Sequence, residues 1–144
     1  MNELCIDASV VLKLVFKGES YRNTARRLLR ESIADNVKLI APPFFESEVD
    51  SAVRKRVYAG GMTSREGKKA LAGLDKLKVE LVVHPLMRKR AREIAERFNQ
   101  PTVYDSVYAA LAEIRGCDLW TADKQFYDAV KAKLKFVKFL PDYS

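Results

Sequence analysis

Short apolar runs alternate along the chain with longer stretches in which apolar residues have helical spacing. The short runs, such as 4–6 and 79–83, are bounded by charged residues, Pro or Gly, as strands of a buried sheet usually are. We expect strands at residues 4–6, 38–41, 79–83, 117–122 and 136–140, the last being the weakest pattern.

Between these runs, apolar residues recur every three or four positions, which indicates helices with one buried face. The first such stripe comprises Tyr21, Ala25, Leu28, Leu29, Ser32 and Ile33. Later stripes lie within residues 44–57, 70–77, 91–98, 104–114 and 126–130. Gly60-Gly61 and Gly116 are expected to end two helices, while Thr63 or Ser64 can cap another.

This alternation predicts an α/β fold with a central, mainly parallel sheet of about five strands joined by right-handed crossovers. The chain has 144 residues, of which 48% are hydrophobic, and this is enough for one continuous core. We therefore expect a single domain spanning residues 1–144.

Features of secreted or membrane proteins are not expected. Lys13 and Lys17 interrupt the apolar run near the N-terminus, which excludes both a signal peptide and a membrane span there. Cys5 and Cys117 lie in apolar stretches without a CxxC partner, so we interpret them as two buried free thiols. These features favour a cytoplasmic protein with no membrane partner.

The net charge is +7, from 26 Lys and Arg against 19 Asp and Glu. The excess is grouped at residues 54–56, 68–69, 88–92 and 131–138. Each group alone is more simply explained as the solvated face of a helix. Their sum favours a polyanionic partner such as nucleic acid.

Four acidic residues interrupt or end apolar segments. Asp7 and Asp123 end the first and fourth strands, Glu48 lies on an apolar helix stripe, and Asp105 opens a helix. Ligands collect at the carboxyl ends of parallel strands, and a buried carboxylate is costly to ionise without a positive partner. The four acids together are most simply explained by a hard divalent cation.

Each acid also has a purely structural interpretation. Asp7 could cap the following helix, Asp105 could favour a helix N-terminus through the dipole, and Asp123 could be a turn residue. Glu48 has no capping role, but Glu46 or Asp50 could be the functional acid if the helix phase is shifted.

The segments that carry these acids resemble the PIN domain, and within it the VapC-type toxin ribonucleases. Ile6-Asp7-Ala8-Ser9 is similar to the opening motif, and residues 41–49 to the Pro-x-x-x-x-Glu-Val segment, which selects Glu48. Residues 104–113 give the closest match, and Leu119-Trp120-Thr121-Ala122-Asp123 matches the Thr-x-Asp ending. Ser51 departs from the Asn of many relatives. The resemblance implies a three-layer α/β/α fold.

We expect Asp7 and Asp123 to bind Mg²⁺ directly, with Mn²⁺ as a substitute, and Glu48 and Asp105 to bind directly or through water. Ser9 and Thr121 would hold neighbouring carboxylates by hydrogen bonds. The resemblance further implies RNA cleavage that leaves a 5′-phosphate, a homodimer, and a cognate VapB-like antitoxin that blocks the site.

Two other functions stay open. One is a housekeeping RNA-processing PIN nuclease, and the other is a catalytically silent PIN module that binds RNA or protein. For an antitoxin, the expected contact surface is the apolar one between the early helices. It comprises Phe45, Val49, Val53 and Val57 on one side and Leu71 and Leu74 on the other.

Overall fold

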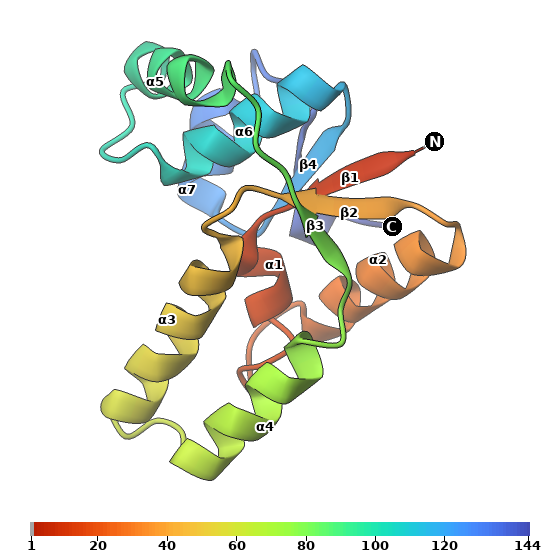
Figure 1. The fold of residues 1–144 in the computed structure, drawn as a ribbon, viewed down its shortest axis with the longest axis vertical. Coiled ribbons are helices and arrows are strands. Elements are labelled where there is room, and N and C mark those ends of the chain that lie inside the picture. Colours follow the sequence, from red (N-terminus) through yellow and green to blue (C-terminus); the bar gives the residue numbers. More distant parts are fainter. Residues whose placement is uncertain (1) are drawn as a thin grey trace.

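The computed structural model describes residues 2–144, which form a five-stranded sheet with helices on both faces (Figure 1). The strands are β1 (Glu3–Ile6), β2 (Lys38–Ala41), β3 (Val79–Leu81), β4 (Asp118–Thr121) and β5 (Val137–Phe139). The helices are α1 (Ala8–Leu12), α2 (Arg22–Ala34), α3 (Phe45–Tyr58), α4 (Ser64–Leu74), α5 (Met87–Arg97), α6 (Tyr104–Arg115) and α7 (Lys124–Val130), followed by the 3-10 turn η1 (Leu140–Asp142).

All neighbouring strands are parallel, in the order β3-β2-β1-β4-β5. With right-handed crossovers, α1 to α4 cover one face and α5 to α7 the other, as in the arrangement of Figure 1. The chain direction across the sheet reverses between β1 and β4, which is where ligands bind in such folds. The structure confirms the α/β prediction, and the sheet is wholly parallel.

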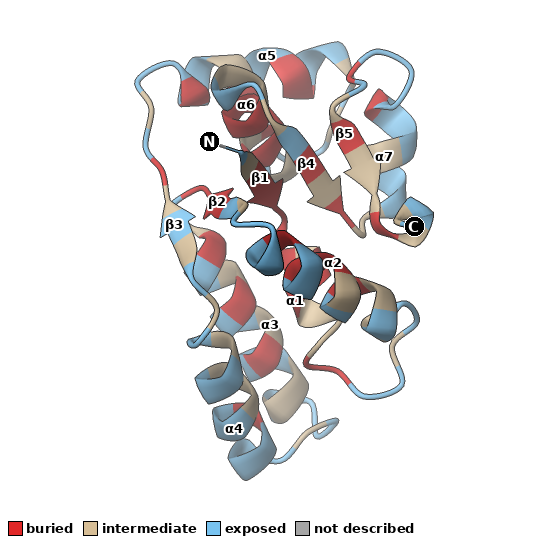
Figure 2. Cartoon of the chain, turned by 90° about the vertical axis from the view of Figure 1, so that its right-hand side faces the viewer, coloured by how far each residue is buried: buried red, intermediate tan, exposed pale blue. Residues whose placement is uncertain are grey.

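The core is centred on β1, β2, β4 and α6 (Figure 2). Five consecutive residues of α6, Tyr108 to Ala112, are buried. Three of them are alanines, whose small side chains let α6 pack closely against both α5 and the sheet. Helix α6 begins immediately beside the carboxyl ends of β1 and β4. Its first turn therefore faces the position between these two strands where the chain direction reverses, which we call the switch point.

Several local predictions were wrong. Helix α1 was not among the predicted helical stripes, because Ala8 to Leu12 is too short to show helical periodicity. Tyr21, Ile33 and Ala129 were expected to face inward, and all three are exposed. Cys5 is buried as expected, but Cys117 is only half-buried, and both thiols are free.

Helix boundaries follow the predicted signals. Thr63 caps α4 in a reciprocal arrangement with Glu66, and Gly116 ends α6 with a positive φ of 69°. Across residues 2–144, no helix combines the length and the apolar character needed to cross a membrane.

Candidate active site

Asp7 follows β1 and is buried, with only 5% of its surface exposed. Its Oδ2 accepts hydrogen bonds from Ser9 Oγ at 2.8 Å and from Thr121 Oγ1 at 2.7 Å. Asp7 stands at the N-cap position of α1, yet its side chain makes no capping hydrogen bond. The capping explanation therefore does not account for this buried carboxylate.

The two hydroxyls join Asp7 to the end of β4. Ser9 Oγ accepts the Ala122 N–H at 2.9 Å, and Thr121 Oγ1 accepts the Asp123 N–H at 3.0 Å. Both hydroxyls thus donate to Asp7, and Ser9 accepts from the backbone of the opposite segment, whereas Thr121 accepts from its own. This arrangement fixes the distance between the segments that carry Asp7 and Asp123.

Asp123 stands at the N-cap of α7, and its Oδ1 accepts the Phe126 N–H at 3.0 Å. The structural interpretation of Asp123 as a turn residue is replaced by a more specific one, because its side chain caps a helix. Only one of the two carboxylate oxygens is used in this way, and the side chain also lies beside Asp105.

Glu48 is half-buried in the first turn of α3 and accepts a hydrogen bond of 2.6 Å from the Tyr108 hydroxyl. Glu46 is exposed and lines a separate groove. Ser51 is exposed. The helix phase that places Glu48 toward the sheet therefore matches the structure.

Tyr108 was assigned to the core from its sequence and not to the site. It is 1% exposed, and burial raises the pKa of its hydroxyl above the ordinary value, with the charges of Asp7 and Glu48 adding to this. It therefore remains a hydrogen-bond donor. A Tyr three residues after Asp105, on the same helix face, was the signal in the sequence that could have identified it.

The carboxylates interact electrostatically. Burial is the largest cause, and together with the negative charges of Asp7, Asp123 and Glu48 it raises the pKa of Asp105 to about 8. Burial is also the main cause that raises the pKa of Asp7 and of Glu48, against the lowering effect of their hydroxyl donors. The structure thus brings all four predicted acids into one group.

The donor set fits a hard cation in its chemistry, because it consists only of carboxylate oxygens. Within residues 2–144, however, no three His, Cys, Asp or Glu side chains are already arranged around one ion position. Asp7, Glu48 and Asp123 each accept hydrogen bonds from protein donors through one carboxylate oxygen. None of the four acids forms an ion pair with any residue of this range.

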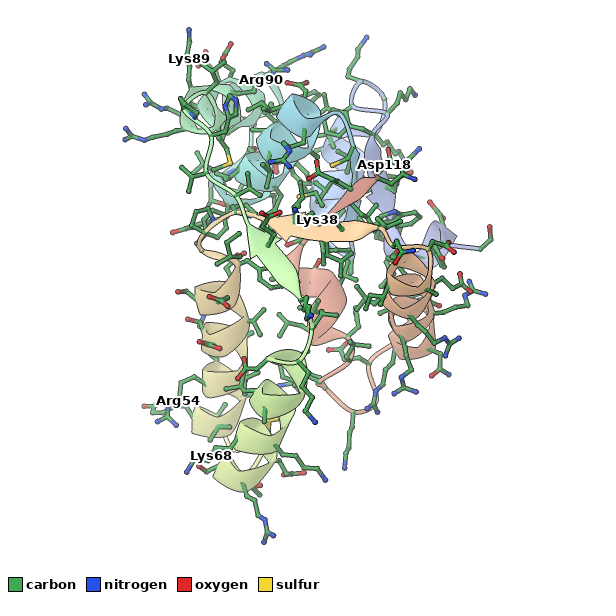
Figure 3. The ribbon with its side chains drawn as sticks, turned by 45° about the vertical axis from the view of Figure 1, so that its right-hand side comes forward. Lys38, Arg54, Lys68, Lys89, Arg90 and Asp118 are labelled. Atoms are coloured by element: carbon green, nitrogen blue, oxygen red, sulfur yellow. The ribbon has the colours of Figure 1, made fainter. Side chains whose placement is uncertain are left out.

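The basic groups do not form one continuous surface. Figure 3 shows Arg54 and Lys68 near one end of the molecule and Lys89 and Arg90 near the other. Arg90 is paired with Glu113, and Lys131 with Asp128. The solvated-face interpretation therefore holds for the individual groups, and any attraction of polyanions comes from the overall positive charge.

The chain belongs to the PIN domain family, whose model matches residues 4–132. Solved structures share its fold. VapC20 of Mycobacterium tuberculosis, described as a toxin that cleaves the sarcin-ricin loop, is 21% identical with a TM-score of 0.63, and the alignment covers 88% of this chain and 94% of VapC20.

Two further structures are similar to this chain. PAE2754 of Pyrobaculum aerophilum is 23% identical with a TM-score of 0.61, covering 97% of this chain and 92% of PAE2754. VapBC2 of Rickettsia felis, solved with a DNA fragment from their promoter, is 14% identical with a TM-score of 0.65, covering 95% and 98%. Curated protein sequences give no match. At these identities the similarity establishes a common fold.

Proposed function

We propose that this chain is a divalent-metal-dependent endoribonuclease and the toxin of a VapBC-type toxin–antitoxin pair. The observation that carries the proposal is the group of four carboxylates at the switch point of a PIN fold, which no Lys or Arg of residues 2–144 neutralises. A polyanionic substrate can approach such a group only when a cation neutralises it.

Asp7 and Asp123 would hold Mg²⁺ or Mn²⁺ directly, with Glu48 and Asp105 as direct or water-mediated ligands. A bound cation of this kind makes water more acidic and stabilises charge on phosphate oxygens. Ser9 and Thr121 keep one oxygen of Asp7 in place, and Tyr108 keeps one oxygen of Glu48 in place. These hydroxyls orient the ligands in the same way as the outer contacts of other metal sites.

Cleavage of a mixed RNA pool tests this proposal. The chain is incubated with RNA in Mg²⁺ or Mn²⁺, and a second sample receives EDTA. We expect 5′-phosphate products with either ion and none in EDTA. Equal cleavage in EDTA would contradict the metal dependence. RNA binding without cleavage under all conditions would instead identify a silent PIN module.

One surface of this chain suits the proposed antitoxin. A groove of about 260 Å³ between α3, α4 and β3 has apolar walls that include Phe45, Val49, Leu71 and Leu74. Glu46, Asp50 and Asp75 also line it. Apolar walls with an acidic rim suit a partner segment that carries apolar side chains flanked by Lys or Arg. Val53 and Val57 were also expected in this surface, but neither lines the groove, and Val53 is buried.

Co-expression with the product of the neighbouring gene tests the toxin assignment. We expect a tight complex that does not cleave RNA, because an Arg or Lys from the partner would pair with the four carboxylates. A complex that cleaves as fast as the free chain would contradict blocking of the site. The absence of any partner would favour the housekeeping RNA-processing function. Light scattering of the same samples tests the proposed homodimer.

A further inference from the structure

Tyr104 is a large aromatic residue that lies exposed beside the carboxylates. It is the first residue of α6 and directly precedes Asp105, yet 54% of its surface is accessible. The packing of α6 in the core comes from Ser106 and the run from Tyr108 to Ala112, all of them buried. The fold therefore does not require burial of the Tyr104 ring, which leaves the ring accessible to a ligand.

Neighbouring aromatic rings hold Tyr104 in a defined position. Its ring centroid lies 5.4 Å from that of Phe44, with the two planes at 77°. Phe44 makes a second edge-to-face contact with Tyr108, at 5.5 Å and 88°, and Tyr108 donates the hydrogen bond to Glu48. Tyr104 is thus linked to Asp105 along the chain and to Glu48 through two rings, so a ligand on it would be positioned relative to both acids.

Two other tyrosines of residues 2–144 are comparably exposed, and neither has this position. Tyr58, 84% exposed, ends α3 ten residues after Glu48, which corresponds to about 15 Å along the helix. Tyr21, 49% exposed, stands before the first turn of α2. Only Tyr104 of these three adjoins one of the four carboxylates in the chain.

We propose that Tyr104 is a base-stacking residue that holds one unpaired RNA base beside the carboxylate group. This inference rests on the proposed ribonuclease function and names the single-stranded character of its substrate at this point. Unpaired bases stack on aromatic side chains, and a fixed ring loses little freedom when it binds. The ring positions a base without selecting its identity, because every base has a face that can stack.

The test measures binding of short single-stranded RNAs to the full chain in Ca²⁺, which takes the same oxygen ligands as Mg²⁺, and gel analysis of each sample verifies that the RNA stays uncleaved. The RNAs carry 2-aminopurine, whose fluorescence falls when it stacks on an aromatic ring. Tyr104→Ala is compared with Tyr104→Phe, which keeps the ring, and with Tyr58→Ala as the matched control. We expect Tyr104→Ala to raise Kd between about 5-fold and about 100-fold and to abolish the quenching. Tyr104→Phe and Tyr58→Ala should bind as the unsubstituted chain does.

Other outcomes overturn the inference in distinguishable ways. Equal Kd and equal quenching for Tyr104→Ala would reject stacking and leave the proposed function intact. An equal loss in Tyr58→Ala would show that the effect is not specific to the carboxylate site. Tyr104→Ala could keep the 2-aminopurine quenching and yet have a lower mass in light scattering. That result would place Tyr104 between two copies of the chain. Failure of the unsubstituted chain to bind or cleave any RNA would reject both proposals.

Discussion

Two sets of acidic residues in this fold differ in their charged partners and in the direction of their pKa shifts. The first set consists of the surface acids that form ion pairs with Lys or Arg, namely Glu3, Glu19, Glu80, Glu113 and Asp128. At the carboxyl ends of β1 and β4, the acids have no such partner within residues 2–144. The ion pairs with Lys38 and Lys124 lower the pKa of Glu80 and Asp128, whereas burial raises the pKa of Asp7, Glu48 and Asp105.

This difference indicates that stabilisation of the fold does not by itself account for the second set, although Asp123 also caps α7. The chain has 26 Lys and Arg, so positive partners are abundant. Burying charges without partners is unfavourable, and proteins usually depart from such local rules at functional sites. The comparison therefore supports a role for Asp7, Glu48, Asp105 and Asp123 that involves an external cation.

The largest expected effect comes from neutralising the proposed direct ligands. Asp7→Asn and Asp123→Asn should lower RNA cleavage by at least about 100-fold, because loss of even an outer contact of a metal site costs about 10- to 100-fold. Asn at 123 still caps α7, so this variant should fold. Cleavage rates and circular dichroism check both points. Unfolding of either variant would instead assign that acid a structural role.

Glu48 and Glu46 lie on different faces of α3, so variants at these two positions show which face carries the functional acid. Glu48→Gln should lower cleavage by tens of fold, on the order expected for a metal ligand or its outer contact. Glu46→Gln should retain the rate, since Glu46 is exposed on the groove side. Both variants are compared in one assay with the same RNA. The reverse result would show that the acid on the other face performs the chemistry.

Tyr108→Phe removes the donor to Glu48 while keeping the ring that packs on Phe44. Cleavage should fall by about 10-fold, and the Mg²⁺ concentration for half-maximal activity should rise, because Glu48 loses its fixed orientation. The free energy of unfolding should fall by about 1 kcal/mol through the lost hydrogen bond. A stability loss with an unchanged Mg²⁺ requirement would limit Tyr108 to packing.

Without metal, Asp105 should make the free energy of unfolding fall as pH rises. The paired surface acids Glu80 and Asp128 have the opposite effect, because their pKa is lowered in the folded chain. The pKa of Asp105 is raised in the folded chain, from 3.8 to about 8, so the folded state binds more protons than the unfolded state between these values. The free energy of unfolding in EDTA should therefore fall as pH rises from about 5 to about 8. Urea unfolding at several pH values measures it, and Asp105→Asn should flatten the dependence. An equal slope in this variant would contradict the assignment to Asp105.

The smallest effect is expected for a paired surface acid. Glu113→Gln breaks the contact with Arg90 and should change the free energy of unfolding by less than about 1 kcal/mol, because both side chains are partly solvated. RNA cleavage should be unchanged. This variant is the control for Asp7→Asn and Asp123→Asn, and a cleavage loss of similar size would remove the distinction between the two sets of acids.

The sequence predicted the alternation of strands and helices and the positions of the four acids, because both depend on short motifs and periodic burial. It did not reveal α1, since five residues after a strand, four of them apolar, carry no periodic signal. Exposure of Ile33 and Ala129 depends on which neighbouring elements reach the helix ends. The link between Tyr108 and Glu48 joins residues 60 positions apart and is set by tertiary packing alone.

Calorimetric titration of the metal-free chain with Mn²⁺ tests the central claim most directly, with Asp7→Asn and Glu113→Gln titrated in parallel. The account predicts saturable binding to the unsubstituted chain and to Glu113→Gln, and binding that is strongly weakened in Asp7→Asn. RNA cleavage should appear over the same range of Mn²⁺ concentration. Equal Mn²⁺ binding by all three proteins, or no binding together with RNA cleavage in EDTA, would contradict it.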